Sequence, residues 1–308
     1  MTWLHRYCRL LAAATLLLVA AGGMVTSTNS GLSVPDWPTT YGRQMFAYPL
    51  SEMQGGIFYE HGHRLIASTV GMLTIGLVIF LWRAEPRAWV RRLGWLALGA
   101  VIAQGVLGGL TVLLMLPDAI SISHAGLAQL FFALTVTIAL VTSRTWLTPA
   151  ASPVDDPGLR RWAPVLTGLV YGQILLGATM RHTGAGLAIP DFPLSYGHLI
   201  PPMWSRPIAI HFAHRVGALV VASAALALIV MVFRRHGGRR ELRNPAGLLA
   251  VLIATQITLG AYVVLSGKQP IVNTLHVATG ALVFVTSLVL TLRLFRVRFD
   301  RPVRPHEA

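Results

Sequence analysis

Two short polar motifs carry the residues of this chain that are best suited to do chemistry. The first is EHGHR at residues 60–64, which leads into an apolar run over residues 65–82. The second is HFAHR at residues 211–215, which leads into a similar run over residues 216–233. Ionisable side chains beside membrane-length apolar segments are costly, so we interpret both motifs as parts of a functional site.

Four histidines share one spacing: each lies 20 residues before an arginine. In a helix that spacing covers about 30 Å, roughly the thickness of the hydrocarbon core of a membrane. All four imidazoles are therefore expected at one depth near the same surface. Paired imidazoles facing each other inside helical bundles are typical of haem iron coordination. The predicted iron ligands are His63, His124, His214 and His276.

Zinc or copper is the competing interpretation of these histidines. A structural zinc site usually has four ligands and often uses cysteine, whereas each half of the chain offers two well-placed histidines. The single cysteine, Cys8, forms neither an intrachain disulfide nor a Cys-x-x-Cys haem attachment motif. A haem would therefore be held without thioether links. We assign no metal role to His61 or His211, which precede the predicted ligands by two and three positions.

The composition predicts an all-α polytopic membrane protein. Of the 308 residues 54% are hydrophobic and only 12% are charged, about half the share of an average soluble protein. The formal net charge of +14 does not indicate nucleic-acid binding, because the arginines fall mainly in alternate loops. The apolar runs predict eight transmembrane helices. Their approximate ranges are 7–26, 60–82, 93–116, 120–142, 161–180, 210–233, 245–265 and 271–295.

The charge distribution predicts the orientation of these helices. Of the 25 lysines and arginines, 19 fall on the side that carries both termini, which is therefore expected to be cytoplasmic. The first 26 residues resemble a secretory signal, but we expect them to remain as the first helix. The absence of a leader rich in arginine and serine favours a bacterial plasma membrane over a mitochondrion.

The chain contains an internal repeat. SGLSVPDWP at residues 30–38 matches AGLAIPDFP at residues 185–193, an offset of 155, and Gln104 and His124 match Gln256 and His276 at an offset of 152. Two four-helix units in the same orientation predict two bundles related by a pseudo-twofold axis along the membrane normal. The predicted segments are an N-terminal bundle at 1–148, a cytoplasmic linker at 149–159, a C-terminal bundle at 160–298 and a basic tail at 299–308.

Several smaller expectations follow from the repeat. The two long outer loops are predicted to fold over the mouths of the bundles, with Asp36 and Asp191 capping turns inside them. Gln104 and Gln256 are predicted to form hydrogen bonds between helices. Close helix packing is predicted at four glycines, Gly105, Gly108, Gly109 and Gly260.

The two halves differ at Glu60, which aligns with His211. The i,i+3 spacing places Glu60 and His63 on one helical face, where the carboxylate could exchange protons with a reacting group or stabilise a cation. We hypothesise that one bundle holds a reacting haem and the other a permanent one. Arg64 and Arg215 are expected to bind haem propionates, with contact to lipid headgroups as the alternative.

Taken together, these motifs resemble the haem A synthase family, with a match over about residues 8–295. The resemblance implies an eight-helix enzyme that converts haem O to haem A for terminal oxidases by oxidising the C8 methyl group to a formyl group. It places the substrate haem O near Glu60, His63 and His124, and a haem B cofactor on His214 and His276. Some relatives carry a cysteine pair in the first outer loop, whereas residues 27–59 of this chain contain none.

The resemblance also implies partners, and other functions compete with it. Haem O synthase is the expected supplier of substrate, while the electron acceptor is not identified and a homo-oligomer is left open. The main alternative is a bis-histidine dihaem electron carrier similar to cytochrome b561, which would not explain a carboxylate in one half only. A transporter built from parallel repeats, without haem, is the third interpretation.

Overall fold

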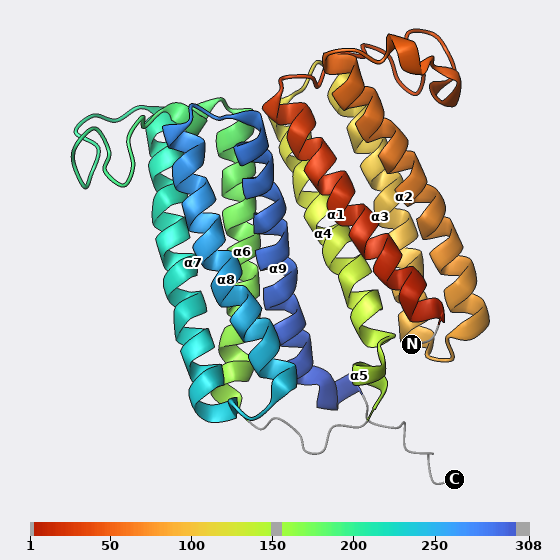
Figure 1. Ribbon diagram of the computed structural model, residues 1–308, viewed down its shortest axis with the longest axis vertical. Helices are drawn as coiled ribbons and strands as arrows, with labels where there is room; N and C mark the ends of the chain where they lie inside the picture. Colours follow the sequence, from red (N-terminus) through yellow and green to blue (C-terminus); the bar gives the residue numbers. More distant parts are fainter. Residues whose placement is uncertain (1–2, 149–155, 300–308) are drawn as a thin grey trace.

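Eight long helices dominate the computed structural model, which describes residues 3–148 and 156–299 (Figure 1). Each of the eight is long and apolar enough to cross a membrane, so the chain is a multi-pass, all-helical membrane protein as predicted. The helices are α1 (Trp3–Ser27), α2 (Gly56–Ala84), α3 (Ala88–Leu113), α4 (Asp118–Val141), α6 (Pro157–His182), α7 (Arg206–His236), α8 (Arg240–Leu265) and α9 (Pro270–Phe299).

The helices form two groups that lie side by side in Figure 1, α1–α4 and α6–α9. Within the first group a buried apolar cluster includes Leu11, Leu77 and Ile138, and within the second a cluster includes Leu166 and Leu249. Contacts between the groups run through α1 with α9 and α4 with α6. The start of α1 and the end of α9 lie at the end opposite the two long loops.

All eight helices begin earlier than the apolar pattern predicts, and in two of them the difference affects the polar motifs. α2 begins at Gly56 and α7 at Arg206, each four residues before its predicted start. At α7 the Ser205 hydroxyl accepts a hydrogen bond from the backbone N–H of Ile208, which caps the first turn. Polar residues in a first helical turn lower the local hydropathy without breaking the helix. As a result, the EHGHR and HFAHR motifs lie inside helices rather than at their mouths.

The predicted linker at 149–159 is wrong at its end. Residues 149–155 lie outside the described part of the chain, but α6 already begins at Pro157. Its first turn is capped by Asp156, whose carboxylate accepts a hydrogen bond from Leu159 N–H at 3.0 Å. A short helix, α5 (Arg144–Leu147), was not predicted. The predicted tail overlaps α9 at Phe299 and otherwise lies outside the described residues.

The two outer loops have matching internal structures. Besides the short 3-10 helices η1 (Met45–Ala47), η2 (Leu50–Glu52) and η3 (Ala185–Leu187), each loop contains a turn capped by an aspartate. Asp36 accepts hydrogen bonds from the N–H groups of Tyr41 and Gly42, and Asp191 accepts them from Tyr196 and Gly197. The predicted capping roles are confirmed. The hydrogen bond from Gly197 N–H is the largest of the effects that lower the pKa of Asp191.

The predicted orientation can be tested with cysteines introduced on opposite sides. The natural Cys8 is buried in α1, so the chain offers a low labelling background. We expect Ser51→Cys, in the first outer loop, to react with a membrane-impermeant maleimide in intact cells. We expect Gly238→Cys, between α7 and α8, to react only after the membrane is opened. Labelling of Gly238→Cys in intact cells would show that the helices have the opposite orientation to the predicted one.

Candidate haem-binding site

The structure places two of the four predicted iron ligands in each group of helices. His63 of α2 and His124 of α4 lie close enough to interact electrostatically. His214 of α7 and His276 of α9 do the same in the second group. Each pair therefore comes from two helices of one group.

Each of these imidazoles lies against a glycine of the preceding helix. A Cβ atom added at Gly22 or Gly177 would lie 3.0 Å from the Cε1 atom of His63 or His214. The same holds for two further pairs, Gly108 with His124 at 3.3 Å and Gly260 with His276 at 3.1 Å. Such distances are shorter than ordinary carbon–carbon contacts. A larger residue at these positions would therefore displace the imidazole ring.

Hydrogen bonds around the histidines leave most of the ring nitrogens free for a ligand. The Nδ1 atoms of His63, His124 and His276 are buried and have no hydrogen-bond partner among the described residues. Buried polar atoms without partners are uncommon in native proteins and are often explained by a bound group. His214 is the exception, because its Nδ1 lies 3.0 Å from the amide nitrogen of Gln173. Because a neutral imidazole nitrogen is a common ligand of iron, each pair is a candidate haem site.

Glutamines fix the backbone or the ring of three of these histidines. The amide of Gln104 donates to the carbonyl oxygen of His124 at 2.9 Å, so its predicted interhelical bond is confirmed. In the second group the Gln256 amide nitrogen lies 3.4 Å from Nε2 of His276. Gln173 also donates to the carbonyl oxygen of His214 at 2.7 Å. These bonds join α3 to α4, α8 to α9 and α6 to α7 at the level of the rings.

Glu60 connects α2 to the first outer loop. Its side chain is buried, and its Oε2 atom accepts a hydrogen bond from Val34 N–H at 2.8 Å. The other oxygen, Oε1, forms an ion pair with Arg64 at 2.6 Å. The carboxylate thus lies one turn before His63, as predicted, and holds the start of the loop over α2.

The second group repeats this contact without the charge. Nδ1 of His211 accepts a hydrogen bond from Ile189 N–H at 3.2 Å, and Ile189 is the repeat equivalent of Val34. His61 also contacts the loop, with Nδ1 3.0 Å from the hydroxyl of Thr40. Both halves therefore attach the loop to a helix through a side chain, and at this contact only Glu60 of the first half carries a negative charge.

Arg64 and Arg215 hold equivalent parts of the two loops. The guanidinium group of Arg64 donates to three backbone carbonyl oxygens, those of Val34, Asp36 and Thr39. Arg215 donates to three carbonyl oxygens at the equivalent positions, those of Ile189, Asp191 and Leu194. These donors are directed at the loops, whereas the sequence predicted that they bind propionates.

Helix packing at the glycines agrees with prediction except at one position. Gly108 and Gly260 contact the histidines, and a Cβ at Gly109 would lie 2.5 Å from the indole ring of Trp37. Gly105 has no atom within 4 Å of an added Cβ, so the prediction of close packing there is wrong. The Trp37 contact places the turn of the first loop against the outer end of α3.

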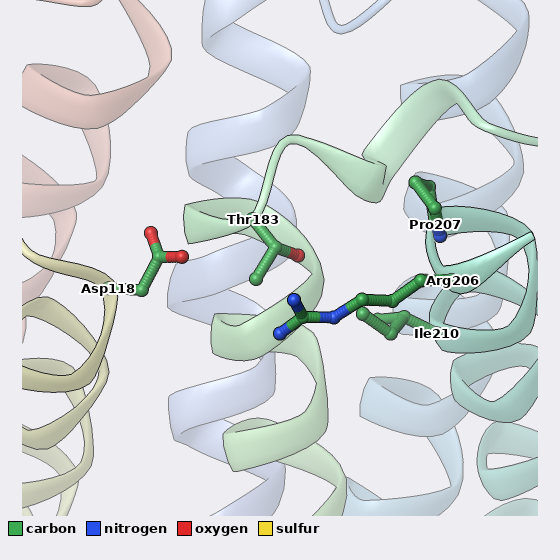
Figure 2. Close-up of a pocket in the computed structure, with 5 residues that line it drawn as sticks. All are labelled: Asp118, Thr183, Arg206, Pro207 and Ile210. Atoms are coloured by element: carbon green, nitrogen blue, oxygen red, sulfur yellow. The ribbon is translucent and has the colours of Figure 1, made fainter.

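Other possible binding sites in the described chain are a zinc cluster, which is absent, and a cleft that is separate from the histidine pairs. Residues 3–148 and 156–299 contain no cluster of three or more histidine, cysteine or carboxylate side chains of the kind that holds a zinc ion. A cleft of about 230 Å³ opens between the ends of α4, α6 and α7 (Figure 2). Its lining residues are Asp118, Thr183, Arg206, Pro207 and Ile210.

Sequence reasoning missed three of the residues that position the histidines. Gly22 and Gly177 are related by the same offset of 155 as the loop motifs, and this repeat relation could have identified them. Gln173 has Leu18 at its repeat equivalent, so a comparison of the halves gives no signal for it.

Comparison with known proteins gives one family. Residues 5–288 match the family model COX15-CtaA, described as cytochrome oxidase assembly protein. A heme A synthase of Symbiobacterium thermophilum is 34% identical over 86% of this chain and 86% of its own length. A heme A synthase of Halalkalibacterium halodurans is 28% identical over 95% of this chain and 99% of its own length.

The glycine contacts give a test of the site. Gly177→Ala should push the His214 ring from its place and weaken pigment binding in the second group by about tenfold, the cost of modest overpacking. Gly172→Ala on the same helix is the matched control, because nothing lies within 4 Å of its added Cβ. The measurement is the haem content and absorption spectrum of the purified protein. Equal spectra for the two variants would contradict the contact.

Proposed function

The chain belongs to the COX15-CtaA family of cytochrome oxidase assembly proteins, and we propose that it is a haem A synthase. In this reaction a methyl group of haem O is oxidised to the formyl group of haem A. The observation that carries the proposal is that each group has two histidines packed against glycines, His63 with His124 and His214 with His276, which would provide two equivalent porphyrin sites. The names of the relatives support the same activity.

We propose that the two sites have different guests. In the first group, His63 and His124 hold the substrate haem O with Glu60 one turn away. In the second group, His214 and His276 hold haem B as a resident cofactor, fixed further by Gln173 and Gln256. Haem B would supply one-electron redox chemistry when bound. The assignment rests on the single difference in charge at the loop contact, Glu60 in one half and His211 in the other.

Glu60 is the residue proposed to act on the reaction. Removing electrons and hydrogen from a methyl group develops positive charge and releases protons, and a buried carboxylate can stabilise the one and accept the other. The ion pair with Arg64 and the hydrogen bond from Val34 N–H fix its orientation. His211 makes the equivalent loop contact without a negative charge, so the second group can hold a haem without altering it.

Arg64 and Arg215 are proposed to keep the outer loops in place over the sites. A guanidinium group that turned toward a propionate would have to release carbonyl oxygens of the loop, and each such charged hydrogen bond contributes about 1.5–3 kcal/mol. Their contribution to haem binding would then be indirect, through the loops. We further propose a bacterial plasma membrane as the location, haem O synthase as the supplier of substrate, and a separate electron acceptor.

The activity is tested by co-expressing the chain with a haem O synthase and separating the extracted haems by chromatography. Haem A, or haem O with a hydroxylated methyl group, is the expected product. Haem B alone in the purified protein would instead indicate an electron carrier, and a colourless protein would remove the proposal altogether. Cells with the synthase alone provide the control.

The role of Glu60 is tested by Glu60→Gln, which keeps an oxygen for the Val34 hydrogen bond but removes the charge. We expect turnover to fall by about a hundredfold or more, the usual contribution of a positioned acid or base. Haem B in the second group should remain. The control is Glu52→Gln, which changes an exposed carboxylate of the first outer loop. Loss of all bound haem in Glu60→Gln would show a purely structural role.

A further inference from the structure

The outer end of the second group carries two cations that the first group lacks. Arg181 lies in the last turn of α6, and its repeat equivalent in α1 is Thr26. Lys268 lies in the turn between α8 and α9, and its repeat equivalent is Leu116. The two halves share the four histidines, the glycines that contact them and the arginine contacts to the loops, so these two cations are a difference within a repeated arrangement.

The two turns that carry Lys268 and Leu116 have the same conformation. Lys268 has a φ of 64° and Leu116 a φ of 58°, both in the left-handed region. Leu116 packs over Gly31 of the first loop, and Lys268 packs over the equivalent Gly186 of the second. The backbone therefore delivers both side chains to the same place at the edge of the loop, and only in the second group is that side chain charged.

Arg181 is a partly buried cation with unused hydrogen-bonding capacity. One nitrogen of its guanidinium group donates to the carbonyl oxygen of Gly23 at 2.5 Å and to the hydroxyl of Ser27 at 3.1 Å. Its Nε atom is buried and has no partner among the described residues. The side chain also lies close enough to His276 to interact with it electrostatically. A cation that is partly removed from water and has no counter-charge favours the binding of an anion beside it.

Lys268 adds a second positive charge at the edge of the second loop, where its side chain packs against Gly186. It interacts electrostatically with His211, which precedes His214 by three residues on α7. Among residues 3–148 and 156–299, no ion pair is formed by Lys268 or by Arg181. Arg181 also lies one helical turn after Gly177 in α6, and Gly177 lies against the ring of His214.

We propose that the side chains of Arg181 and Lys268 bind the propionate carboxylates of the haem in the second group. This inference rests on the proposed function and adds to it the residues that recognise the acidic edge of the porphyrin. Guanidinium and ammonium groups bind carboxylates through charge-assisted hydrogen bonds. Thr26 and Leu116 offer no such charge in the first group. A guest there is held mainly by its iron and its apolar faces, which suits a substrate that must leave as product.

The proposal is tested by comparing iron protoporphyrin IX with its dimethyl ester, which has the same ring and iron but no carboxylates. The full-length chain is produced in haem-deficient cells, with His63→Leu and His124→Leu so that only the second group binds. We expect the diacid to bind at least about tenfold more tightly than the ester. Lys268→Gln and Arg181→Gln should each reduce this preference, and Arg181→Lys should restore part of it.

The control is Arg206→Gln, which removes a cation from the same outer surface. Arg206 lines the separate cleft in Figure 2, where its side chain extends from α7 toward the end of α6. The Arg206→Gln variant should prefer the diacid over the ester by the same factor as the parent chain does. If Arg181→Gln does not fold, Lys268→Gln alone decides, because among the described residues the Lys268 side chain makes no hydrogen bond between helices.

The outcomes separate this inference from the proposed function. Equal affinity of the parent chain for the diacid and the ester, or an unchanged preference in both glutamine variants, would overturn the carboxylate site while leaving haem binding intact. A chain that binds neither porphyrin would overturn the proposed function as well. A preference that falls in the two variants and persists in Arg206→Gln would establish the site.

Discussion

The structure depends on keeping four imidazoles inside membrane-spanning helices, where water cannot satisfy their nitrogens. The solution is the same at each ring: a glycine on the neighbouring helix opens a space, and the ring lies against its backbone. In three of the four cases a glutamine adds a hydrogen bond at the same level. Helix packing and ligand placement are therefore one problem, because the distance between helices also sets the position of each ring.

A comparison of the two halves distinguishes residues proposed to bind a porphyrin, which both halves contain, from residues proposed to act on it, which only one half contains. Both halves keep an arginine that clamps three loop carbonyls and a side chain that accepts a hydrogen bond from the loop. Several of the differences are charges: Glu60 occurs in the first half, and Arg181 and Lys268 occur in the second. A small number of ionisable groups can thus assign different tasks to two otherwise matched sites.

The sequence predicted the helices and the histidine pairs because both leave periodic signals. Eight apolar runs have the length of a membrane span, and an equal distance from each histidine to an arginine fixes a common depth. The direction of a long side chain leaves no such signal, which is why the loop clamp of Arg64 and Arg215 was not predicted. Capping by Ser205 also escaped the hydropathy pattern, so the start of α7 was placed four residues late.

Arg181 also donates its hydrogen bonds across the boundary between the two groups, to Gly23 and Ser27 of α1. Asn273 and Thr274 of α9 reach the same serine hydroxyl. A side chain that contacts the proposed cofactor site is therefore anchored on the other half of the duplicated chain. Because these bonds join the two groups, a displacement of α1 would also displace Arg181, and the two halves of the repeat are structurally coupled.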